Sequence, residues 1–256
     1  MNRRGTGIAV MALLAMLAGA GCVTTGGGSE IGGKDAAQAN LQLGVAYLRQ
    51  NNLPVAKEKL ERARDQDSRS SAVHSALALL YEKLGDDKRA DAEHRTAVNL
   101  APRDPEVQNN YAAFLCAKGR YGAGVERFDE AAANPLYRTP WAAYTNAGVC
   151  LRRAGSEGDA TQRFDKALAA RPSYVEAVVQ LADLELAQNK AQAAYQRIDQ
   201  FLMRNPPSAE LLLLGWRAAR ALNDRPNMER LARQLQAEYP NTEQARAVTA
   251  ARGSGG

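Results

Sequence analysis

Residues 105–138 read PEVQNNYAAFLCAKGRYGAGVERFDEAAANPLYR. Positions 7, 11 and 24 of this stretch hold the large residues Tyr111, Leu115 and Phe128. Positions 8, 20 and 27 hold the small residues Ala112, Gly124 and Ala131. The same pattern recurs in stretches that begin at Ala37, Ser71, Trp141, Val175 and Ala209. Successive starts are 34, 34, 36, 34 and 34 residues apart, and the extra two residues fall in 134–140. In the last stretch either Trp216 or Gly215 can be the eighth residue, so its register stays open by one.

This period resembles that of the tetratricopeptide repeat (TPR), in which each unit is a pair of antiparallel helices. A small eighth residue allows the second helix to cross the first closely, and five units have one: Gly44, Ala78, Ala112, Gly148 and Ala182. Turn residues such as Gly85 and Asn223 separate the two helices of a unit. We therefore expect an all-α superhelix of six helix-turn-helix units over residues 37–242. A further helix in 243–256 is expected to cap the apolar end of the stack, followed by a disordered tail.

The first 21 residues have the layout of a secretory signal peptide: a basic start, a short apolar run from Ile8 to Ala20, and small residues before Cys22. A cysteine at this place resembles the lipobox of bacterial lipoproteins, although Gly19 stands where the lipobox usually has Leu. That resemblance implies a covalent lipid on Cys22. Val23, in place of Asp, implies sorting to the outer membrane. An ordinary cleaved signal is the alternative. Residues 22–36 are rich in Gly and are expected to form a flexible tether.

Composition argues against several classes of function. The full chain carries a net charge of +5, and removing Arg3 and Arg4 with the signal leaves +3, without the basic runs of a nucleic-acid-binding protein. Only two histidines are present, His74 and His94, and with the cysteines they form no recognisable zinc spacing. No phosphate-binding loop or catalytic nucleophile arrangement is recognisable, and the six units leave no segment of domain size. We therefore expect no enzyme and no cofactor other than the lipid.

A TPR stack binds its partners, extended peptides or helices, in a concave groove formed by the first helix of each unit. The residues expected to face this groove are Leu41, Val45, Arg49, Ser75, Leu79, Glu82, Asn109, Asn110, Ala113, Thr145, Asn146, Val149 and Arg153. Asn110 and Asn146 occupy the sixth position of consecutive units, a slot used by peptide-clamping TPR proteins. The matching Lys/Arg set is incomplete, which argues against a clamp for C-terminal carboxylates.

Three segments, 104–116, 146–150 and 211–222, resemble the type IV pilus biogenesis lipoproteins of the PilF/PilW family. The resemblance extends over nearly the whole mature chain. It implies a monomeric pilotin, a lipoprotein on the periplasmic face of the outer membrane. Such a protein escorts secretin subunits there, after sorting by the lipoprotein export machinery, and helps them multimerise. The alternative is a generic outer-membrane TPR scaffold for barrel-protein or cell-wall assembly.

Cys116 and Cys150 are the only cysteines left once Cys22 is acylated. They are the twelfth residue of the third unit and the tenth of the fourth, so both lie on first helices at similar height. Export places them in an oxidising compartment where disulfides persist. We therefore predict a disulfide between them; the alternative is a pair of buried free thiols.

Overall fold

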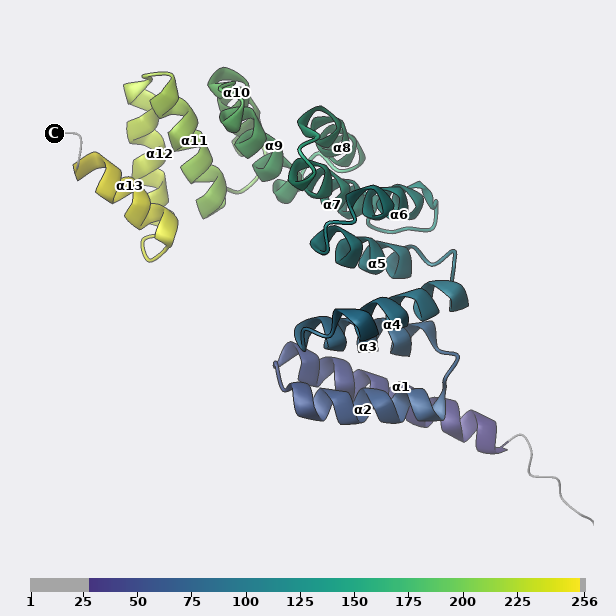
Figure 1. The fold of residues 1–256 in the computed structure, drawn as a ribbon. Helices are drawn as coiled ribbons and strands as arrows, with labels where there is room; N and C mark the ends of the chain where they lie inside the picture. Colours follow the sequence, from purple (N-terminus) through teal and green to yellow (C-terminus); the bar gives the residue numbers. More distant parts are fainter. Residues whose placement is uncertain (1–27, 254–256) are drawn as a thin grey trace, which may run out of the picture.

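The computed structural model describes residues 28–253, and the side chains of residues 32–252. This part of the chain is all α-helical (Figure 1). Its helices are α1 (Gly28–Arg49), α2 (Leu53–Gln66), α3 (Ser71–Lys83), α4 (Asp87–Leu100), α5 (Pro105–Ala117), α6 (Tyr121–Ala133), α7 (Pro140–Arg153), α8 (Glu157–Ala170), α9 (Val175–Ala187), α10 (Ala191–Leu202), α11 (Ala209–Ala221), α12 (Arg225–Glu238) and α13 (Glu243–Gly253). The twelve helices α1 to α12 form six consecutive pairs, so the predicted TPR superhelix is confirmed.

The turn inside each pair depends on one residue in the left-handed backbone conformation. This is the fifteenth residue of every unit: Asn51, Gly85, Gly119, Gly155, Asn189 and Asn223, with φ between 57° and 80°. Glycine adopts this conformation without strain, and asparagine tolerates it better than most residues. Asn223 is the fifteenth residue only if the sixth unit begins at Ala209. The turn therefore resolves the open register in favour of Trp216 as the eighth residue.

Close crossing of the two helices explains the glycines at the eighth position. A Cβ atom added to Gly44 would lie 2.5 Å from Leu60 Cδ2, and one added to Gly148 would overlap the buried ring of Phe164. In the sixth unit the glycine stands one place earlier, and a Cβ on Gly215 would meet Ile198 and Leu231 at 3.2 and 3.3 Å. The small residues are therefore required by packing.

The C-terminal helix α13 covers the open end of the stack, as predicted. Ala245 and Val248 are buried against a cluster that includes Trp216 and Leu231. Arg252 Nη2 lies 2.7 Å from Glu229 Oε2 on α12 and adds an exposed ion pair. The helix therefore shields apolar surface that a seventh unit would otherwise cover.

The expected tether is wrong for residues 28–36, because α1 already begins at Gly28. Once a helix is nucleated by packing, each added residue costs little, so a helix can extend into a weakly helical sequence. The next turn of α1 is held against α2, because Ala37 is buried and Asn40 Nδ2 donates to Gln66 Oε1 at 2.8 Å. Residues 1–27, with the expected signal and Cys22, lie outside the described residues.

First helices form one continuous side of the stack. The backbones of successive first helices approach each other closely, whereas successive second helices meet only through long side chains, such as Arg163 on α8 with Asp129 on α6. Neighbouring units are therefore closest along the first helices. The stack curves accordingly, as the arc from α1 to α11 in Figure 1 shows.

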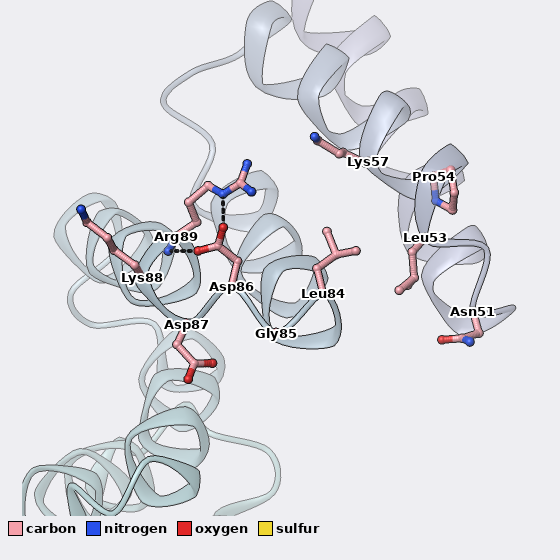
Figure 2. Close-up of a pocket in the computed structure, with 10 residues that line it drawn as sticks. All are labelled: Asn51, Leu53, Pro54, Lys57, Leu84, Gly85, Asp86, Asp87, Lys88 and Arg89. Carbon is pink, nitrogen blue, oxygen red and sulfur yellow. Dashed lines mark hydrogen bonds and ion pairs between the residues drawn. The ribbon is translucent and has the colours of Figure 1, made fainter.

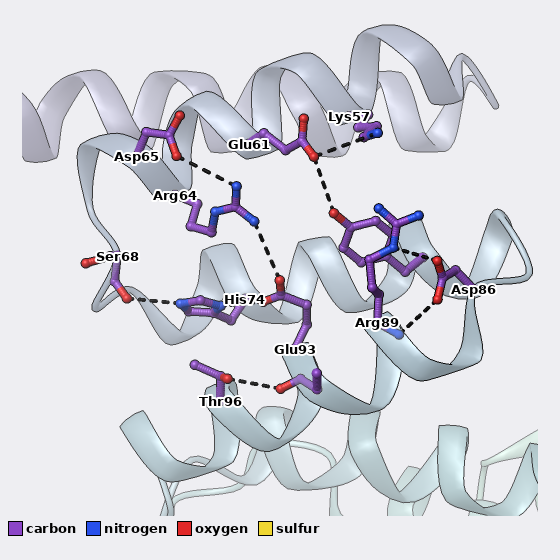
Figure 3. A network of polar contacts seen from close by, with 12 residues as sticks. Lys57, Glu61, Arg64, Asp65, Ser68, His74, Asp86, Arg89, Glu93 and Thr96 are labelled. Atoms are coloured by element: carbon purple, nitrogen blue, oxygen red, sulfur yellow. Dashed lines mark hydrogen bonds and ion pairs between the residues drawn. The ribbon is translucent and has the colours of Figure 1, made fainter.

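A polar network joins the first two units (Figure 3). Tyr81 Oη on α3 donates to Glu61 Oε1 on α2 at 3.3 Å. Arg64 on α2 lies 3.8 Å from Glu93 on α4, whose second carboxylate oxygen is 2.5 Å from His74 Nδ1. The network therefore couples α2, α3 and α4 around one largely buried histidine.

The surroundings of His74 favour its charged form, which predicts a pH-dependent stability. Nδ1 faces the Glu93 carboxylate and Nε2 faces the Ser68 carbonyl at 3.0 Å, and only the doubly protonated ring donates to both. The hydrogen bond to Glu93 raises the pKa of His74, against the opposing effect of burial. A raised folded-state pKa contributes stability below the unfolded pKa of about 6.5, and this is lost as the pH rises through the folded value. The melting temperature should therefore fall as the pH is raised from 6 to 9.

The variant His74→Gln should lose this part of the pH dependence, and Glu93→Gln should lose the same part because it removes the partner. Calorimetric melting curves across the pH series provide the measurement. An unchanged pH slope in both variants would mean that His74 is not the titrating group.

Candidate functional site: the first-helix face

The first-helix side of the stack carries a continuous row of side chains at the ninth position of each unit. In the first four units this row is apolar: Val45, Leu79, Ala113 and Val149. Leu79, in the middle of α3, is 42% exposed. Val45 and Val149 are half-buried, and Ala113 is exposed. An apolar row of this kind is available to pack against side chains of a partner.

Amide and charged residues lie beside the apolar row. Asn109 and Asn110 are half-buried, and Asn146 on α7 is exposed and donates from Nδ2 to Asn109 Oδ1 at 3.3 Å. Arg49 and Arg153 are exposed near the C-terminal ends of α1 and α7. These polar groups can hydrogen-bond the backbone of an extended segment.

Three residues predicted to face the groove are buried, so their assignment to it is wrong. Thr145 is only 2% exposed, and its Oγ1 donates to Trp141 O at 2.8 Å within α7. Leu41 and Ser75 occupy the same fifth position and are also buried. The fifth position turns toward the neighbouring helices, and among the six units only Asn109 and Leu213 remain half-exposed there.

Glu82 is held by the core more than the sequence pattern suggests. Its Oε1 lies 2.8 Å from Nε2 of His94, a ring that is almost fully buried and stacks on Tyr111. The Glu82 side chain is partly exposed. Its first role is therefore to satisfy a buried histidine.

In units five and six the ninth position holds the charged residues Asp183 and Arg217, which are not among the predicted groove residues. Asp183 lies 3.0 Å from Arg152 and 3.6 Å from Arg217, so the three residues form a chain of ion pairs across α7, α9 and α11. Burial and the nearby carboxylates of Glu176 and Asp183 raise the pKa of Glu210. The repeat period could have identified Asp183 and Arg217, because they follow Val149 at intervals of 34 residues.

The predicted disulfide is present. Cys116 on α5 and Cys150 on α7 are bonded, with their Cα atoms 5.7 Å apart. Both side chains are buried. A Cβ on Gly124 would meet Cys116 Sγ at 2.5 Å, so the sulfur occupies the space that the alanines of other units fill. The bond ties together the third and fourth units, between which the repeat spacing is irregular.

A hollow lies away from the first-helix face, at the turn edge between the first two units (Figure 2). Leu53 and Pro54 of α2 and Leu84 at the end of α3 supply its apolar surface, and Lys57 and Arg89 stand at its margin. None of the predicted groove residues lines it. It therefore adds no support to the first-helix face as a site.

Comparison with known proteins establishes the family. The type IV pilus assembly protein PilF of Pseudomonas aeruginosa is 31% identical over 226 residues, which cover 87% of this chain and 90% of the relative. The chain belongs to the PilF family. The solved structure of P. aeruginosa PilF superposes with a TM-score of 0.68 at 30% identity, covering 86% of this chain and 99% of that one. No protein-family model matches the chain.

PilW, described as a widely conserved type IV pilus biogenesis factor, has a similar structure. Its TM-score is 0.69 at 28% identity, with 83% of this chain and 98% of PilW covered. PilF-family membership identifies the chain as a homologue of type IV pilus assembly factors and as a TPR scaffold without enzymatic activity. Within residues 28–253, none of the helices has the length and apolar character needed to span a membrane.

Proposed function

We propose that this chain is a pilotin: an outer-membrane lipoprotein that binds secretin subunits and promotes their localisation and multimerisation during type IV pilus biogenesis. The observation that carries the proposal is the similarity to PilF over nearly the full length of both chains. A TPR stack has no chemistry of its own, so its contribution to pilus assembly is to hold a partner. The secretin is the pore through which type IV pili emerge, and its strand-rich subunits need protection until they reach the outer membrane.

The binding surface that we propose is the first-helix face of units one to four. Its members are the predicted residues that keep exposed area: Val45, Arg49, Leu79, Glu82, Asn109, Asn110, Ala113, Asn146, Val149 and Arg153. The apolar row supplies contact area, and the asparagines beside it supply hydrogen bonds. This combination suits an extended or helical segment of the secretin subunit.

The anchor that we propose is a lipid on Cys22, with which the lipoprotein export machinery sorts the protein to the outer membrane. Several acyl chains on one residue hold a protein at a bilayer far more firmly than one chain does. Tethering also raises the effective concentration of the groove near membrane-bound subunits. One molecule would then both bind the secretin subunit and be anchored at the outer membrane.

The proposed binding surface is tested by placing a charge on the first-helix face. Leu79→Glu should lower the amount of secretin multimer in membranes by at least about tenfold, because an unpaired buried charge costs a few kcal/mol in an interface. Leu84→Glu is the matched control, because Leu84 is 44% exposed but lies at the turn edge. The readout is secretin multimer on gels of outer-membrane fractions, with Cys22→Ser as the mislocalised reference.

Normal multimers in Leu79→Glu would remove the first-helix face from the proposal. If the protein instead captured barrel proteins or cell-wall enzymes and no secretin, the generic scaffold would replace the pilotin. Circular dichroism of both glutamate variants must show unchanged helix content, because either change adds a charge to a helix end or middle.

A further inference from the structure

The loop between α6 and α7, residues 134–139, displays an apolar side chain. Leu136 is 83% exposed, more than any other large hydrophobic residue in the described part of the chain. The loop contains the two-residue insertion that breaks the repeat spacing. An exposed leucine forgoes the free energy that its burial would release. Leu136 is therefore available to contact another apolar surface.

The loop is held in a defined conformation. Asn134 Nδ2 donates to the carbonyl of Arg103 at 2.8 Å, and Asn134 Oδ1 accepts from Leu136 N at 2.9 Å. The ring of Tyr137 is 93% buried, in the cluster that holds the disulfide. Leu136 thus projects from a loop whose conformation is fixed on both sides of it. Such a side chain can contact a partner without the loop having to reorder.

Two exposed arginines flank Leu136. Arg138 follows it in the same loop, and Arg103 lies in the adjoining loop 101–104. Among the residues that the structure describes, neither guanidinium has an ion-pair partner, whereas the neighbouring Asp104 caps α5 by accepting from Val107 N. Leu136 and Arg103 line a shallow hollow together with the acidic Glu130. The surface around Leu136 is therefore mixed in charge and not strongly basic. Loops 101–104 and 134–139 are called the loop edge below.

The loop edge lies on the side of the molecule where the folded chain begins. Figure 1 shows the α4–α5 and α6–α7 connections on the same side as the N-terminal end of α1. Cys22 precedes Gly28, the first residue of α1, by six residues. Six residues span at most about 20 Å. A lipid on Cys22 would therefore hold the start of α1 within about 20 Å of the bilayer, on the side of the molecule that also carries the loop edge.

We propose that the loop edge contacts an anionic phospholipid surface. Leu136 enters the boundary between headgroups and acyl chains, and Arg103 and Arg138 contact lipid phosphates. The inference rests on the proposed function in one respect, because the lipid on Cys22 is what brings the edge to the bilayer. The contact would orient the stack and leave the first-helix face free for cargo.

The test uses the mature chain with Cys22→Ser, so that no acyl chain contributes to binding. It is mixed with vesicles of phosphatidylethanolamine and phosphatidylglycerol, or of phosphatidylethanolamine and phosphatidylcholine, and bound protein is measured by flotation. The anionic vesicles should bind more protein. Leu136→Ser should lower the partition coefficient by about tenfold, near the lower end for burying a leucine. Arg138→Glu should lower it by about fivefold or more, as expected for one basic residue at an anionic surface.

The matched controls are Leu84→Ser and Lys88→Glu, which change an exposed leucine and a lysine at the opposite, turn edge. Both should bind as the parent does. Equal binding to neutral and anionic vesicles, or equal losses in the control pair, would overturn the proposal. So would loss of a secretin contact in Leu136→Ser with vesicle binding unchanged, because the edge would then bind protein.

This assay contains neither secretin nor acylated protein, so it fails independently of the proposed function. In the acylated full-length protein, an environment-sensitive dye on Leu136→Cys provides a second readout. Its emission should shift to the blue on anionic vesicles, while a dye on Leu84→Cys should not shift.

Discussion

Replacing Cys116 and Cys150 together with alanine is expected to lower the free energy of unfolding by about 3–4 kcal/mol. The disulfide closes a loop of 34 residues in sequence, and this is the chain-entropy estimate for a loop of that size. The bond joins α5 and α7 across the irregular 134–140 segment, where the regular stacking of units is interrupted. Because solenoid units contact only their neighbours, we expect this junction to open first when the bond is missing.

Denaturant titration of the oxidised protein and the double variant measures the loss. Hydrogen exchange should show that the amides of α6 and α7 lose protection before those of α3 and α11. Reductant should lower the melting temperature of the parent and leave that of the double variant unchanged. A loss below about 1 kcal/mol, or a melting temperature that reductant does not change, would show that the bond adds little to the stack.

Gly148→Ala is expected to destabilise the protein by about 1–3 kcal/mol, the range for overpacking a close-packed interior. The added Cβ would overlap the ring of Phe164, which is fully buried. In an exposed helix the same change would stabilise by up to about 1 kcal/mol, because glycine is a poor helix former. The sign of the effect therefore reports the close crossing of α7 and α8.

Gly158→Ala in α8 is the matched control, because no atom lies within 4 Å of the Cβ position there. It should be neutral or stabilise by up to about 1 kcal/mol. The measurement is the free energy of unfolding of each variant, compared with that of the parent protein. Equal effects would mean that the eighth-position glycine is not selected by packing.

The candidate site was only partly predictable from its residues. Val45, Leu79, Ala113 and Val149 follow from counting to the ninth position, and all four keep exposed area. Leu41, Ser75 and Thr145 were misplaced, because the fifth position lies near the boundary between the exposed face and the packed side of the helix. A residue at such a boundary is buried or exposed according to how the next unit tilts, and repeat spacing does not report the tilt.

The sequence by itself determined the all-α repeat and the number of units, and it placed Cys116 and Cys150 where a disulfide was possible; the structure shows that the bond is formed. These depend on local spacing, because a 34-residue period places each residue type at the same height in every unit. Only the tertiary structure decided the register of the last unit, the start of α1 at Gly28, and which polar groups meet across units. The ion pairs of Asp183 with Arg152 and Arg217 join residues that are about one repeat apart, and the exposure of Leu136 depends on how one insertion folds. Such features arise from the packing of neighbouring units, where small shifts of whole helices set the distances between side chains.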